Sequence, residues 1–91
     1  MLLIEEQPHV ELHSRTGGVY RLPIDAARDA YDFFMSRDPY EILETVDAYG
    51  SALAVERSDV VAVLVLEAET LARYAAERDE RRRRALLGAH D

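Results

Sequence analysis

The sequence contains no cysteine, which excludes a disulfide, a zinc knuckle, an iron–sulfur cluster and a thiol nucleophile. No apolar run approaches the roughly 18 residues that a membrane-spanning helix needs. Residues 1–4 carry no basic side chain and run directly into Glu5 and Glu6, so we expect no secretory signal peptide. These absences predict a cytoplasmic protein without a membrane partner.

Lysine and asparagine are absent as well, and all eleven basic residues are arginine. The codons of lysine and asparagine are AT-rich, whereas those of arginine, alanine and glycine are mostly GC-rich. A GC-rich bacterial or phage genome explains this bias more simply than a chemical requirement for arginine does.

The chain is short and acidic. Ninety-one residues predict one domain, residues 1–91, and a chain of this size buries only about two-thirds of the surface that its unfolded form exposes. Without a disulfide, association with another copy is the common way to gain burial. The net charge of −7 disfavours free binding to nucleic acid, because phosphates repel an acidic surface.

A β-hairpin followed by a helix is predicted for the first half. Residues 9–15 alternate between apolar and polar side chains, residues 19–22 form the return strand, and Gly17-Gly18 supplies the positive φ angles of a tight turn. Residues 25–37 have the helical apolar spacing, with Asp25 as N-cap and Asp38-Pro39 as the stop. Four residues form the predicted apolar stripe of this helix: Ala27, Ala30, Tyr31 and Phe34.

Three strand-like segments follow, at residues 40–47, 52–57 and 60–66, and predict a β-meander. The last one does not alternate. Val61, Val63 and Val65 would face one way, and Val60, Ala62, Leu64 and Leu66 the other. A strand that is apolar on both faces must be covered on both.

A long C-terminal helix is predicted from about Glu69. Its docking stripe, Leu71, Tyr74 and Ala75, gives way to eight consecutive charged residues at 77–84, so residues 77–91 should project beyond the core. Three i, i+4 ion pairs would support this segment: Glu77–Arg81, Asp79–Arg83 and Glu80–Arg84. Residues 77–84 carry five arginines and three acids, a net +2, which leaves −9 for the remaining residues.

The predicted fold class is therefore α+β: a mostly antiparallel sheet of four to five strands, in the order β-hairpin, helix, β-meander and long C-terminal helix. Both helices are expected on one face of the sheet. The other face would then have no cover within the chain.

No catalytic, cofactor-binding or metal-binding residue is assigned. His9, Glu11 and His13 share one strand face and invite a metal interpretation, but the same pattern describes any solvated strand face. Carboxylates are too abundant to single out a pair, the serines lack a nucleophile-elbow context, and no phosphate-binding loop is present. We therefore predict a protein that is not an enzyme.

The leading functional hypothesis is a bacterial or phage protein that self-associates and binds another macromolecule, as an adaptor, an inhibitor of the immunity type or a structural subunit. The expected partners are a second copy and another protein. The residues expected at the oligomer interface are Val61, Val63, Val65, Leu86 and Leu87.

Two alternatives remain open. The chain would be a nucleic-acid-binding accessory protein if its arginines contact phosphates; these are Arg78, Arg81, Arg82, Arg83 and Arg84. It would be an oligomeric small-molecule binding module if His13, Tyr31 or Tyr74 line a pocket between subunits. The net charge, length and composition of the chain are compatible with both alternatives.

Overall fold

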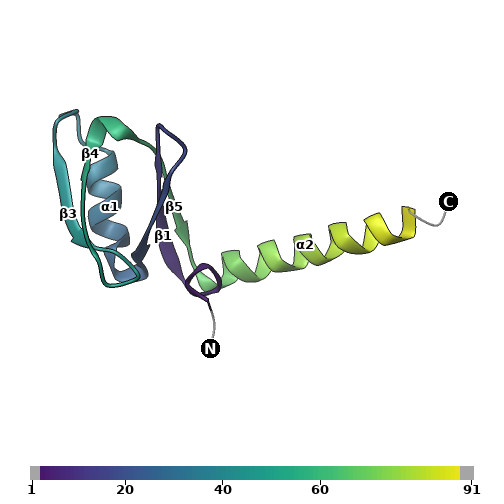
Figure 1. The fold of residues 1–91 in the computed structure, drawn as a ribbon. Helices are drawn as coiled ribbons and strands as arrows, with labels where there is room; N and C mark the ends of the chain where they lie inside the picture. Colours follow the sequence, from purple (N-terminus) through teal and green to yellow (C-terminus); the bar gives the residue numbers. More distant parts are fainter. Residues whose placement is uncertain (1–2, 89–91) are drawn as a thin grey trace.

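The computed structural model describes residues 3–88, and it has the α+β architecture that the sequence predicted (Figure 1). The strands and helices, in chain order, are β1 (His9–Ser14), β2 (Val19–Pro23), α1 (Ala27–Phe34), β3 (Ile42–Val46), β4 (Ala52–Glu56), β5 (Val60–Leu66) and α2 (Ala68–Gly88). Three short 3-10 turns complete them: η1 (Ile4–Glu6), η2 (Ile24–Ala26) and η3 (Arg57–Asp59).

The strands form two antiparallel sheets instead of one. A three-stranded sheet has the order β2-β1-β5, and β3 pairs with β4 in a separate hairpin. The predicted meander is therefore wrong at its last strand, because β5 leaves β4 and pairs with β1. Two tight glycine turns support the hairpins, since Gly17 has φ +96° and Gly50 has φ +87°, values that side-chain-bearing residues rarely adopt.

The turn η3 explains why β5 changes sheets. The backbone N–H of Arg15, at the end of β1, donates to Asp59 O at 2.7 Å, and the buried Ser14 hydroxyl donates to the Asp59 carboxylate at 3.1 Å. The Arg57 guanidinium meanwhile donates to Phe34 O at 2.6 Å and to Val60 O at 2.9 Å. These bonds hold the turn between the end of α1 and the end of β1, so the following strand starts beside β1.

The apolar core lies between the inner face of the three-stranded sheet, α1 and the β3–β4 hairpin. It unites Val10, Leu12 and Leu22 of the sheet with Phe33 of α1 and Val55 of β4, together with the buried Ala30 and Val60. The pairs Val10↔Leu22 and Leu12↔Tyr20 place alternate residues of β1 and β2 on this inner face. The alternating pattern thus predicts correctly which residues of β1 face the core.

Helix α1 is shorter than predicted. It ends at Phe34 instead of residue 37, and no side chain caps its N-terminus, so Asp25 does not have the predicted role. The Arg57 guanidinium donates a hydrogen bond to the carbonyl of Phe34, and its central carbon lies 4.5 Å from the centroid of the Phe34 ring. Ala30 and Phe33 are the buried residues of α1, whereas Tyr31, a member of the predicted stripe, is exposed.

Helix α2 does not cover the sheet. It begins directly after β5 and extends away from the rest of the described chain, residues 3–67, which we call the body. The helix leaves the body on the side opposite α1 and the β3–β4 hairpin (Figure 1). None of its residues is buried. Because the helix projects, the molecule is 54 Å long but only 28 and 20 Å across. The prediction of two helices on one face is wrong, because α2 has only a few apolar residues to pack. The predicted projection is observed to residue 88, and residues 89–91 lie outside the described part of the chain.

Candidate interaction surfaces

Strand β5 is less covered than its apolar sequence demands. The side chains of Val61, Leu64 and Val65 are 57%, 41% and 38% exposed, respectively. Only the two end residues, Val60 and Leu66, are buried. A seven-residue strand without a polar side chain therefore keeps apolar surface in water on both faces, which costs about 25 cal/mol per Å².

A bulge resets the alternation of β5. Ser14 pairs with Val60 and His13 with Ala62, so Val61 is an extra residue between them. Val60 therefore packs into the core together with Val63, although strict alternation had placed these two on opposite faces. The predicted facing of Val60 was wrong for this reason.

A polar cluster lies on the outer face of the three-stranded sheet, with the Glu11 carboxylate at its centre. The Nε2 atoms of His9 and His13 each lie 3.0 Å from a Glu11 carboxylate oxygen, and Arg21 Nε lies 3.6 Å from Glu11 Oε2. Cross-strand pairing of Glu11 with Arg21 brings the arginine there. Arg21 was not among the predicted site residues, because a two-residue turn at Gly17-Gly18 would have put residue 24 opposite Glu11, whereas the observed register pairs His13 with Val19 and Glu11 with Arg21.

The state of this cluster follows from its hydrogen bonds. Burial raises the pKa of Glu11. The hydrogen bonds from His9 and His13, together with the charges of His9 and Arg21, lower the pKa by more than burial raises it, so the net pKa is below the ordinary 4.5. His9 Nδ1 also lies 2.6 Å from Gln7 O, so both nitrogens of this buried ring face acceptors.

The cluster is not arranged as a metal site. In a metal site the histidine nitrogens and the carboxylate oxygens would point at a common centre, but here the two Nε2 atoms bond to the carboxylate itself. No group of three or more potential ligands with metal-binding geometry occurs in residues 3–88.

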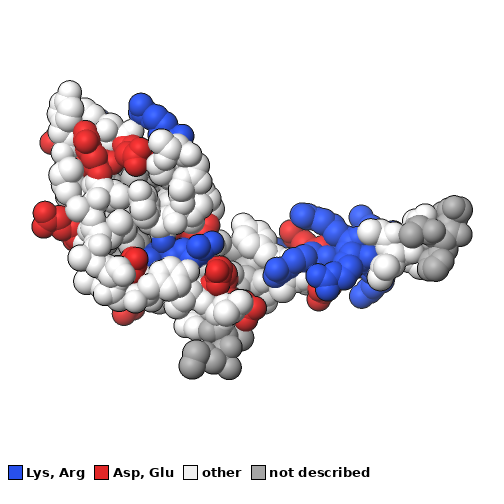
Figure 2. Space-filling model, viewed as in Figure 1, with Lys and Arg blue, Asp and Glu red and all other residues white. Residues whose placement is uncertain are grey.

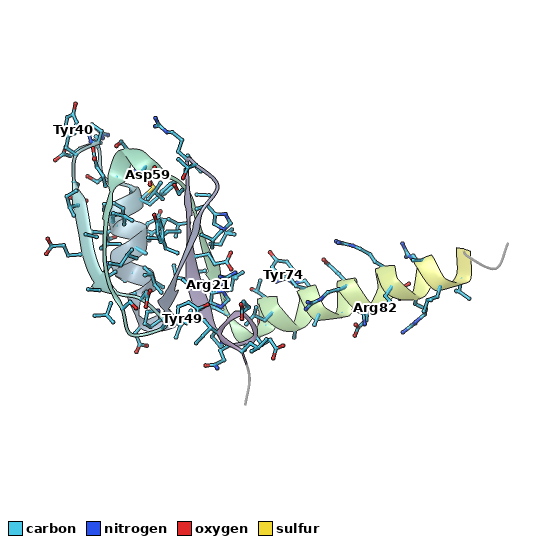
Figure 3. All side chains as sticks on the ribbon, viewed as in Figure 1. Arg21, Tyr40, Tyr49, Asp59, Tyr74 and Arg82 are labelled. Atoms are coloured by element: carbon cyan, nitrogen blue, oxygen red, sulfur yellow. The ribbon has the colours of Figure 1, made fainter. Side chains whose placement is uncertain are left out.

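An open cleft separates the outer sheet face from α2. It has a volume of about 480 Å³, and its apolar floor is formed by Leu64 and Leu66 of β5 and by Leu71 of α2. Charged side chains and Tyr74 surround this floor, namely Glu5, Glu11, Glu77, Arg78 and Arg81. Figure 3 shows Arg21 on the sheet and Tyr74 on the first half of α2, on the two sides of the angle between them. A second hollow, lined by Ile4, Ile24 and Ala48 among others, is smaller, at about 210 Å³.

Apart from Arg73, the arginines of α2 lie from the middle of the helix onward, whereas acidic residues are scattered over the body (Figure 2). Arg81 pairs with Glu77 and Arg84 with Glu80, as predicted, but Arg83 pairs with Glu80 instead of Asp79. Within residues 3–88, no carboxylate lies within 4.0 Å of the guanidinium groups of Arg78 and Arg82. The helix therefore presents unneutralised positive charge.

The residues of the predicted pocket do not come together. His13 lies on the outer face of the sheet and Tyr74 on α2, on the same side of the molecule, with Tyr74 lining the cleft. Tyr31 lies on α1, which packs on the inner face. The predicted interface residues are likewise divided, because Val61, Val63 and Val65 lie on the body and Leu86 and Leu87 at the far end of α2, where both are exposed.

Comparisons with known proteins identify no relative. No family model, no curated protein and no solved structure matches this chain. Within residues 3–88, neither α1 nor α2 combines the length and the apolar character of a membrane-crossing helix.

Proposed function

We propose that this chain is a non-enzymatic protein that self-associates through its body and uses α2 to bind another protein. The observation that carries the proposal is the uncovered β5, whose exposed Val61, Leu64 and Val65 are the kind of apolar surface that a second subunit buries. The core of so small a body gains little stability alone, and association supplies further burial.

The shape of α2 supports the second part of the proposal. Twenty-one helical residues span about 31 Å, and none is buried. The helix combines exposed apolar side chains, Tyr74, Leu86 and Leu87, with charged groups of both signs. Tyrosine and arginine are enriched at protein interfaces, so this composition favours a protein partner.

Light scattering coupled to gel filtration tests self-association. The expected result is a mass of at least twice 10.3 kDa at micromolar concentration. A monomer at every concentration up to 100 micromolar would overturn the proposal, because the exposed strand would then be stable in water.

Nucleic acid is the second candidate partner, and the free guanidinium groups of Arg78 and Arg82 favour it. Replacing both by glutamine would reduce the slope of log affinity against log salt by about two if each contacts a phosphate of duplex DNA or RNA. Replacing the ion-paired Arg81 and Arg84 is the matched control. No binding of a mixed-sequence duplex or single strand at 50 mM salt would remove this candidate.

A further inference from the structure

The two edges of the three-stranded sheet differ in protection. Edge strand β2 has five residues, includes Arg21 and Pro23, and is partly capped because Ala48 N–H donates to Arg21 O at 2.8 Å. Charges, proline and covering loops are the usual means of blocking an edge. At this edge, therefore, further pairing is obstructed.

The opposite edge has none of these blocks. Strand β5 has seven residues, no charge and no proline, and within residues 3–88 its backbone pairs with β1 alone. Its single irregularity is the bulge at Val61. The hairpin strands β3 and β4, which also have free edges, carry Glu44 and Glu56. Among the edges, β5 is thus the one most open to an added strand.

We propose that two copies pair through their β5 strands, antiparallel and centred on Val63, to form one continuous six-stranded sheet. This inference rests on the proposed self-association and specifies its partner, edge and register. Centring on Val63 aligns all seven residues, and any shift shortens the ladder. Val63 then faces its own counterpart, Val61 faces Val65, and Ala62 faces Leu64, so the strand is complementary to itself.

The symmetry of this pairing has consequences for charge and for α2. The strand brings no charge into the pairing, and the body's like charges meet only at its ends, where Asp59 would face Glu67 of the other copy. Arg15 lies at that point, because its guanidinium donates to Ser58 O at 2.8 Å. A two-fold axis perpendicular to the sheet keeps both outer faces on one side, so both α2 helices leave the dimer on that side and can bind a partner bivalently.

Single cysteines test the register without background, because the native chain contains none. Under mild oxidation, Val63→Cys should form a disulfide-linked dimer, since directly opposite residues lie about 4.5–5.5 Å apart. Val61→Cys is the matched control. It is more exposed, but in this register the two copies of residue 61 are four residues apart along the strands, roughly 13 Å, and should not link. A mixture of Ala62→Cys and Leu64→Cys chains should link across the two kinds of chain.

The outcomes separate the two proposals. Linking at residue 63 and between residues 62 and 64, with at least tenfold less at residue 61, supports the β5 register. A dimer by light scattering whose cysteines link equally at 61 and 63, or at neither with the mixture also unlinked, overturns the register but leaves self-association intact. A monomer by light scattering overturns both. If Val63→Cys fails to fold, the mixture of Ala62→Cys and Leu64→Cys decides the register alone.

Discussion

At the scale of single residues, two side chains of opposite charge, Glu11 and Arg57, each make two hydrogen bonds within the body. Glu11 accepts hydrogen bonds from two histidines on the outer sheet face, and Arg57 joins the end of α1 to the start of β5. Most other charged side chains are exposed, where ion pairs contribute little to stability. Substitution of these two residues should therefore have unusual effects.

Replacing Glu11 by glutamine should lower the free energy of unfolding at pH 7 by about 2 kcal/mol, because charged hydrogen bonds to the histidines are lost. The folded-state pKa of Glu11 is depressed, so its contribution is complete above the unfolded value of about 4.5 and disappears as the pH falls through the folded value. Urea unfolding of both proteins between pH 3 and 7 measures this. Glu44→Gln, at an exposed position of β3, should change stability by less than about 0.5 kcal/mol. A constant Glu11→Gln difference across this range would contradict the prediction.

Replacing Arg57 by alanine should cost about 2 kcal/mol, because two backbone carbonyls lose a charged donor and the Phe34 ring loses its cation. Lysine should restore only part of the loss, since it cannot bond both carbonyls in the same planar geometry. Thermal and urea unfolding measure both variants. Arg28→Ala is the control, because Arg28 is 88% exposed. Equal stability of Arg57→Ala and Arg28→Ala would show that the hydrogen bonds from Arg57 to Phe34 O and Val60 O are dispensable.

At the scale of elements, β5 and α2 were predicted with sound bounds but incomplete contacts. The run from Val60 to Leu66 is a strand over the predicted residues, and the i, i+4 spacing of acids and arginines is consistent with a helix that continues to Gly88 without tertiary packing. Neither pattern indicates which other part of the molecule the strand or the helix packs against. The strand's alternation could not reveal the bulge at Val61, which arises from the fit between β5 and the end of β1.

A charge on β5 should weaken the proposed self-association without unfolding the body. Val61→Lys places an ammonium group at the free edge, where pairing would bury it, and should weaken the dimer at least tenfold, about 1.4 kcal/mol. Val46→Lys is a close control, because Val46 is also a strand residue, 55% exposed against 57% for Val61, but lies on the other sheet. Analytical ultracentrifugation of the two variants gives the comparison. Equal association constants would exclude β5 as the interface.

At the scale of the whole molecule, the described chain consists of a compact body and a projecting helix. The body contains every buried residue of the described chain, and α2 contributes none. The outer sheet face, the cleft and the helix belong to the same side of the molecule, so the proposed partner of α2 would also lie near the Glu11 cluster. Stability and partner binding should therefore be separable.

Ending the chain after Ala76 should leave the folded body and the proposed self-association intact. Residues 77–88, the described part of the removed segment, include no buried residue, so the free energy of unfolding should change by less than about 1 kcal/mol. Circular dichroism should show a loss of helix with a preserved cooperative transition, and light scattering should show an unchanged number of subunits. Dissociation of the shortened chain would mean that α2, and not β5, holds the copies together.

The sequence by itself determined the elements, the class of fold and the charged projection, because these depend on local periodicity, turn residues and i, i+4 spacing. Alternation in residues 9–15 was enough to put Val10 and Leu12 on one face of the strand, but the register that pairs Glu11 with Arg21 depends on the exact loop between Ser14 and Gly18, which only the structure showed. Only the tertiary structure decided that β5 joins β1, since this depends on how η3 bonds to α1 and β1, contacts between residues far apart in the chain. The tertiary structure likewise showed that β5 is an edge strand of its sheet. It also showed that the sheet lies between Tyr31 on one side and His13 and Tyr74 on the other.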